Sequence, residues 1–255
     1  MPETTNLQRF VVLSNARSGS NMLVTMLDGH PEVRCFGEVF NPQSSFGYEN
    51  WIRKSLWRRL GNQYIRNYCT ERYLDSLCAP GSQDKVQAVG FKVIYPGQFD
   101  RCSNFRYYWR TREFKAIGLT RENSLRRYVS SRIANEEGVW SAKEQRDRKV
   151  SVEVDVNDLL HAVARMETVN RLIETLTAEF WGIGVKYEAL LLHRERVLKK
   201  IFQFLGVNES QAVRVQPTTV KQNPARLDEI IDNYEEVRSA LLGTAYERFL
   251  EEPSD

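Results

Sequence analysis

Cysteine is scarce in this chain, and the few cysteines stand far apart. The 255-residue sequence contains four of them, with no CxxC pair and no cluster of histidines nearby. Zinc sites and disulfide frameworks need closer or repeated spacings, so we expect free thiols and no bound metal. The cysteines are Cys35, Cys69, Cys78 and Cys102.

Long apolar runs and an excess of one charge are also missing. No stretch approaches the roughly 20 apolar residues that cross a bilayer, and the apolar run after the polar Met1–Gln8 is too short for a signal-peptide core. We therefore expect a cytoplasmic protein without a transmembrane segment. The 36 basic and 33 acidic residues leave a net charge of only +3, which gives no reason to expect nucleic acid as a partner.

What the chain does have is an alternation of strand-like and helix-like segments. Long stretches separate runs rich in Val, Ile and Phe, which favours a parallel sheet covered on both faces by crossover helices. Apolar residues at three- and four-residue steps across 159–176 predict an amphipathic core helix. We expect one α/β domain over residues 1–255. The predicted strands are Phe10–Ser14, Ala88–Tyr95, Lys115–Thr120 and Trp181–Lys186.

The first predicted strand runs into a small polar turn and then an apolar helix. Gly19 lets the backbone approach an anion, and the free N–H groups at the helix start favour negative charge. A Walker loop would need Gly where Asn15 stands and Lys where Ser20 stands. The cation is instead Arg17, which suits a terminal anionic group better than a magnesium-bridged triphosphate. The alternative is a plain strand-to-helix turn.

This strand, Arg-Ser-Gly-Ser and apolar helix resembles the 5′-phosphosulfate loop of sulfotransferases that use 3′-phosphoadenosine 5′-phosphosulfate (PAPS). The resemblance implies a P-loop-like three-layer fold and a loop at 14–22 that binds the cofactor. The residues it assigns to the 5′-phosphosulfate are Arg17, Ser18, Gly19, Ser20 and Asn21.

A second segment, 121–132, resembles the 3′-phosphate site of the same enzymes. Arg121 follows a predicted strand and Ser130 lies nine residues later on the next helix. The resemblance implies that this pair binds the 3′-phosphate, with Ser131 as an alternative to Ser130. In the other interpretation Arg121 caps a strand end, and the remaining arginines of the helix form a solvated face. These arginines are Arg126, Arg127 and Arg132.

Two further residues point to proton and charge chemistry. Glu38 lies between aliphatic and aromatic residues, where the pKa of a carboxyl can rise enough for a general base. Its Gly-Glu-aliphatic-aromatic-Asn context resembles nodulation-type lipopolysaccharide sulfotransferases and the trehalose sulfotransferase group, in which this Glu is the proposed base. Without the resemblance, a surface or loop-bracing role would be favoured.

Lys92 is a cation among apolar strand neighbours, and a buried Lys needs an anionic partner. In cytosolic sulfotransferases, a Lys on the comparable strand contacts the sulfuryl group and a catalytic His follows two residues later. Ile94 stands at that later position here. This departure argues against a His-based mechanism and for Glu38 as base. The alternative is a lysine on an edge strand that extends to solvent.

Near the C-terminus, Lys221 and Asn223 in an irregular segment at about 216–224 resemble a loop that closes over the cofactor, with a bland surface loop as the alternative. The matches keep the family's order from about residue 10 to residue 235. They imply metal-independent transfer of a sulfuryl group from PAPS to a hydroxyl or amine of a carbohydrate or small molecule, leaving 3′-phosphoadenosine 5′-phosphate (PAP). A P-loop small-molecule kinase using ATP and a non-catalytic nucleotide-binding scaffold stay open. The motifs do not identify the acceptor. They also leave the oligomeric state open, with a homodimer as one alternative.

Overall fold

The computed structural model describes residues 7–41, 70–78, 85–101, 109, 113–138, 150–218 and 226–251. Its centre is a five-stranded parallel sheet with the strand order β2-β3-β1-β4-β5. The α/β fold with a parallel sheet flanked by helices is confirmed. The strands are β1 (Gln8–Ser14), β2 (Val33–Glu38), β3 (Ala88–Ile94), β4 (Lys115–Thr120) and β5 (Ile183–Lys186).

Four of these strands match predicted segments, with two differences. The sequence analysis did not predict β2, which pairs with β3 at one edge of the sheet. The last strand begins at Ile183 rather than Trp181, because Trp181 has a φ of 55° and its side chain is 90% exposed. A residue in this left-handed conformation ends the preceding helix region and cannot start an extended strand.

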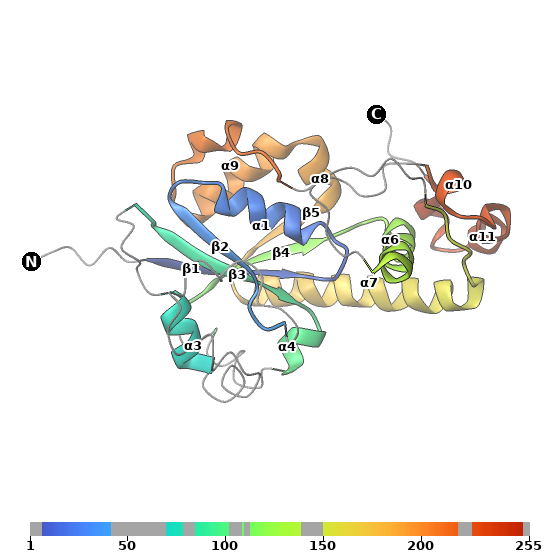
Figure 1. Cartoon of the computed structure of the whole chain (residues 1–255), viewed down its shortest axis with the longest axis horizontal. Coiled ribbons are helices and arrows are strands. Elements are labelled where there is room, and N and C mark those ends of the chain that lie inside the picture. Colours follow the sequence, from blue (N-terminus) through green and yellow to red (C-terminus); the bar gives the residue numbers. More distant parts are fainter. Residues whose placement is uncertain are drawn as a thin grey trace, which may run out of the picture.

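Helices cover both faces of the sheet, which gives three layers (Figure 1). On one face lie α1, α8 and α9, and on the other lie α3, α4 and the C-terminal half of α7. The helices are α1 (Ser20–Asp28), α3 (Thr70–Leu77), α4 (Gly97–Arg101), α6 (Ser124–Glu137), α7 (Val156–Glu179), α8 (Tyr187–Leu192), α9 (Arg194–Leu205), α10 (Leu227–Ile230) and α11 (Tyr234–Leu241), with short 3₁₀ helices η1 (Glu209–Val213) and η2 (Glu247–Leu250).

Strand residues alternate between the two layers, as the period of a pleated strand requires. In β1, Val11 and Leu13 pack toward α3 and α7, whereas Phe10 and Val12 pack toward α1 and α9. Lys92 of β3 lies level with Val12 in the sheet. It is buried on an interior strand, so the edge-strand alternative for this lysine is wrong.

A third apolar cluster lies beside the sheet rather than on it. The N-terminal half of α7 and helix α6 pack there against α10, α11 and η2 (Figure 1). The predicted amphipathic helix is thereby confirmed, although Leu172 of its apolar stripe is exposed. Among the described residues, no helix is long and apolar enough to span a bilayer.

Candidate active site

The loop between β1 and α1 has a backbone conformation that residues other than glycine seldom adopt. Arg17 and Gly19 have φ angles of 61° and 81°, and both lie in the left-handed region. A Cβ atom at Gly19 would stand 2.3 Å from Cδ2 of Tyr187, the first residue of α8. Glycine is therefore required here for space as well as for conformation. The Ser18 hydroxyl braces the turn by donating to the Asn15 carbonyl at 2.7 Å.

The guanidinium of Arg17 reaches the second predicted segment. Its Nε and Nη2 both donate to Oγ of Ser130, at 3.1 and 2.9 Å. Ser131 instead donates to the backbone carbonyl of Arg127 within its own helix, at 3.1 Å. The structure thus brings Ser130, and not Ser131, against the loop. A residue predicted for the 5′-phosphosulfate and one predicted for the 3′-phosphate thus lie in direct contact.

Two more arginines lie around this loop. Arg121, directly after β4, donates from Nη1 to the Arg17 carbonyl at 3.2 Å and stacks over the Tyr187 ring at 4.9 Å. Arg127 of α6 donates from Nε to the Ala16 carbonyl at 2.9 Å. Both side chains are buried, so the interpretation of Arg127 as part of a solvated helix face is wrong. Arg126 is also buried, and Arg132 is exposed.

Burial lowers the pKa of all three guanidinium groups. It lowers the pKa of Arg121 and of Arg17, and it lowers the pKa of Arg127 to about 10. The charge of Arg121 adds to the shift of the other two. Buried Nε of Arg121 and Nη1 of Arg127 have no hydrogen-bond partner among the described residues. Buried N–H donors of this kind are costly unless an acceptor reaches them, so the cluster is suited to an anion.

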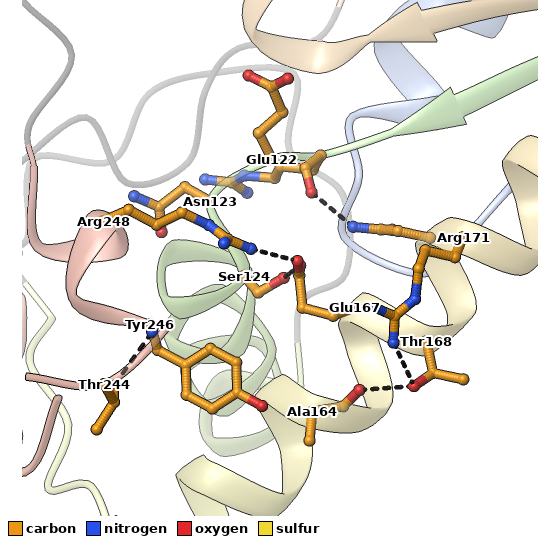
Figure 2. A network of polar contacts seen from close by, with 12 residues as sticks. Glu122, Asn123, Ser124, Ala164, Glu167, Thr168, Arg171, Thr244, Tyr246 and Arg248 are labelled. Carbon is orange, nitrogen blue, oxygen red and sulfur yellow. Dashed lines mark hydrogen bonds and ion pairs between the residues drawn. The ribbon is translucent and has the colours of Figure 1, made fainter.

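A polar network fixes the first turn of α6, directly after Arg121 (Figure 2). Glu167 of α7 accepts from the buried Ser124 hydroxyl at 2.6 Å and from Nη2 of Arg248 at 2.7 Å. Asn123 caps α6 by accepting from the Arg126 N–H at 2.8 Å. The network ties the region after β4 to α7 and to η2 near the C-terminus. The backbone that carries Arg121 is therefore held from two sides.

Glu38 and Lys92 form the second part of the site. The pairing of β2 with β3 is regular up to Phe36 and Phe91, then skips Gly37 and places Glu38 opposite Lys92. This bulge aims the carboxylate at the lysine, as bulges near functional sites often do. Oε1 of Glu38 lies 2.9 Å from Nζ of Lys92, whose side chain is only 2% exposed.

Lys92 also donates to Oδ1 of Asn21, in the first turn of α1. The β1–α1 loop and the Glu38–Lys92 pair are therefore neighbours at the carboxyl ends of β1, β2 and β3. This edge is where open α/β sheets place their ligands. The predicted residues that the structure describes form one site, and Lys221 and Asn223 lie outside the described residues.

Three donors surround the carboxylate of Glu38. Its Oε2 accepts from Nε2 of Gln98 at 2.8 Å and from Nδ2 of Asn41 at 3.0 Å. Burial by itself would raise the pKa of Glu38, but the charge of Lys92 and the hydrogen bonds from all three residues hold the pKa below its usual value. The expectation of a raised pKa is wrong for this structure. Burial lowers the pKa of Lys92, and Glu38 opposes that shift.

Three residues of this site were missed in the sequence. No role is predicted above for Tyr187 or Gln98, and Arg127 is given there only as part of a solvated helix face. The cue for Tyr187 and Arg127 was that each directly follows or lies near the carboxyl end of a predicted strand, where ligand sites gather. Gln98 carries the same cue, since it lies three residues after the predicted strand Ala88–Tyr95.

Comparison with known proteins adds an independent observation. No protein-family model matches the chain. It is 26% identical over 243 residues to nodulation protein H of Rhizobium tropici, covering 95% of this chain and 92% of that protein. The chain is a distant homologue of nodulation protein H. The predicted resemblance to nodulation-type proteins is confirmed.

The chain is also similar to solved structures, at lower sequence identity. The sulfotransferase domain of the Synechococcus PCC 7002 olefin synthase has a TM-score of 0.49 and 21% identity, covering 100% of this chain and 92% of that chain. A mouse sulfotransferase complexed with PAP has a TM-score of 0.43 and 13% identity, covering 95% of this chain and 88% of that chain.

Proposed function

We propose that this protein is a PAPS-dependent sulfotransferase that modifies a hydroxyl, or an amine, of a carbohydrate or small molecule. The observation that carries the proposal is the convergence of buried arginines on the β1–α1 loop, next to a carboxylate paired with a buried lysine. Homology to nodulation protein H supports it. An anion site and a proton acceptor at one sheet edge are the two parts that such a transfer requires.

The residues present fit a bisphosphorylated nucleotide. Arg17 and the loop from Ser18 to Asn21 are suited to the 5′-phosphosulfate. Arg121 and Ser130 are suited to the 3′-phosphate. The Nε of Arg121, which has no hydrogen-bond partner within the described part of the chain, supports this assignment. Gly19 keeps the loop backbone clear of any Cβ, so an anion can approach its N–H groups closely. Lys221 and Asn223 remain candidates for a segment that closes over the nucleotide.

In the proposed reaction, bound PAPS supplies the sulfuryl group, whose bond to the 5′-phosphate oxygen breaks as sulfur forms a new bond to the oxygen of a hydroxyl acceptor or the nitrogen of an amine. Glu38 takes the acceptor proton, which leaves the sulfated acceptor and PAP as products. Lys92 and the arginines place positive charge where the leaving phosphate gains negative charge. Because side chains of this protein supply that charge, the proposed transfer is metal-independent.

Nucleotide binding tests the proposal first. Calorimetric titration with PAP should show binding that needs no magnesium and that is much tighter than binding of ADP, which has no 3′-phosphate. The matched variant Ser130→Ala should lose part of that preference, while Ser131→Ala should keep it. Preference for magnesium-ATP would favour a kinase, and the absence of nucleotide binding would overturn the proposal.

Turnover is tested next, with labelled PAPS and a panel of sugars, glycolipids and small alcohols and amines. Transfer of label to any of them establishes the enzyme and begins to define its acceptor. Tight PAP binding with no transfer to any acceptor, and no PAP release from PAPS, would favour a binding scaffold over an enzyme.

A further inference from the structure

We propose that Gln98 is a positioning residue that fixes the orientation and the basicity of the Glu38 carboxylate. This inference rests on the proposed function in one respect, namely the role of Glu38 as the base. In the sequence, only its position just after a predicted strand marks Gln98. The contacts that assign it join α4 to the ends of β2 and β3.

The amide of Gln98 has one orientation open to it. The side chain is 8% exposed, and its Oε1 accepts from the backbone N–H of Ile94 at 3.1 Å. Because a backbone N–H can only donate, the oxygen of the amide must face Ile94 and the NH₂ group must face Glu38. Nε2 then donates to Oε2 of Glu38 at 2.8 Å. Gln98 therefore links the end of β3 to the carboxylate.

The two oxygens of Glu38 have different partners. Oε1 is paired with Lys92, whereas Oε2 accepts from the neutral amides of Gln98 and Asn41. Lys92 is the charged group that faces this carboxylate from β3, and on the α1 side Lys92 contacts the neutral Asn21. The buried thiol of Cys35, on the same strand as Glu38, interacts electrostatically with Lys92. Because Lys92 holds Oε1 of Glu38, the position of Oε2 depends on the side-chain amides of Gln98 and Asn41.

This arrangement controls basicity as well as geometry. A hydrogen bond to the charged form of a carboxyl favours that form and lowers its pKa. Gln98 is one of the donors that hold the pKa of Glu38 below its usual value. Removing the donor should therefore raise the pKa, and replacing it with a second carboxylate should raise it further. If Gln98 only supported the fold, its substitution would change the stability of the protein without shifting the pKa of Glu38.

Two substitutions at the same position separate these effects. In Gln98→Glu, the new side chain can still accept from the Ile94 N–H, but it places a carboxyl oxygen against Oε2 of Glu38. Two carboxyls that share a site cannot both ionise easily, so the pair should titrate with one midpoint raised by about one unit or more. In Gln98→Met, which has a similar volume and no donor, we expect a smaller shift in the same direction.

The experiment is a pH titration of the protein labelled with ¹³C at glutamate carboxyls, followed by NMR. Glu38→Gln identifies the Glu38 signal by its disappearance. Gln203→Glu on the exposed side of α9 is the matched control for added charge and should leave the Glu38 midpoint unchanged. The proposal is overturned if the Glu38 midpoint is the same in the wild type and in both folded Gln98 variants.

PAP titration of the same samples keeps the two proposals apart. If the variants bind PAP like the wild type and the Glu38 midpoint moves, both proposals are supported. If no sample binds PAP, the proposed function fails while the carboxyl titration still decides the role of Gln98. Thermal melting of each variant shows that it is folded. If Gln98→Met is not folded, Asn41→Ala replaces it and should also raise the midpoint, because it removes the other amide donor to Oε2.

Discussion

Replacing Arg121 by Met should weaken PAP binding without destabilising the free protein. The side chain is buried, and its Nε has no hydrogen-bond partner among the described residues. Each hydrogen bond between a charged group and the phosphate contributes about 1.5–3 kcal/mol, so the loss of one should raise the PAP dissociation constant about 10- to 150-fold. Met fills a similar volume and leaves no large cavity.

The stability of the free protein should change little, because the positive charge of Arg121 repels the arginines beside it. The charge of Arg121 contributes to lowering the pKa of Arg17 and of Arg127, so its removal relieves repulsion between buried cations. The stacking on Tyr187 and the hydrogen bond to the Arg17 carbonyl are lost in exchange, each at a cost of about 0.5–1 kcal/mol. These effects oppose each other, and we expect the Tm without ligand to stay within about 3 °C of the wild type, which corresponds to about 1 kcal/mol in a protein of this size.

Calorimetric titration with PAP and melting curves with and without PAP measure both effects. Arg132→Met is the matched control, since Arg132 lies on α6, the helix that follows Arg121, and has an exposed side chain. It should change neither the PAP affinity nor the Tm. Unchanged PAP affinity in Arg121→Met, or a loss of affinity equal to that of the control, would refute the assignment of Arg121 to an anion.

Three other variants test separate parts of the site. Gly19→Ala should abolish most PAP binding, because the new methyl group must displace Tyr187, and titration would show an affinity near that of the wild type if this reasoning were wrong. Glu38→Gln should keep PAP affinity within about threefold and lose turnover by about 10²- to 10⁴-fold, the usual contribution of a general base; full turnover would remove Glu38 from that role. Glu167→Ala should lower the free energy of unfolding in urea by about 1–3 kcal/mol, because the buried Ser124 hydroxyl loses its acceptor, and an unchanged value would contradict this.

The sequence was sufficient to predict the parts of the fold that local patterns determine. Apolar runs gave β1, β3 and β4, and the spacing across residues 159–176 gave α7. The strand β2 was missed because Arg34 and Gly37 interrupt its apolar run. In the structure, Arg34 pairs with Asp28 at 3.1 Å, and Gly37 lies in the bulge. The ion pair depends on α1 and the bulge depends on the partner strand β3, so the apolar pattern of this segment alone shows neither.

The site was predictable in its residues more than in its electrostatics. The motif indicated Arg17 and Gly19, and the structure brings them together with Ser130. The burial of Arg127 could not be predicted, because its contact with Ala16 joins residues 111 positions apart. The predicted direction of the Glu38 pKa shift was wrong for a similar reason. The residues that flank Glu38 indicate only burial, whereas the donors that lower its pKa include Lys92 and Gln98 from another segment of the chain.

The long helix α7 takes part in two apolar clusters. Its N-terminal half packs in the cluster beside the sheet, and its C-terminal half packs against the sheet itself. With 24 residues it spans about 36 Å as one continuous element. Neither cluster can lose its packing without exposing part of the same helix. We therefore expect amide hydrogens along the buried side of α7 to exchange with solvent at similar, slow rates in both halves, and the C-terminal segments to open together with the sheet.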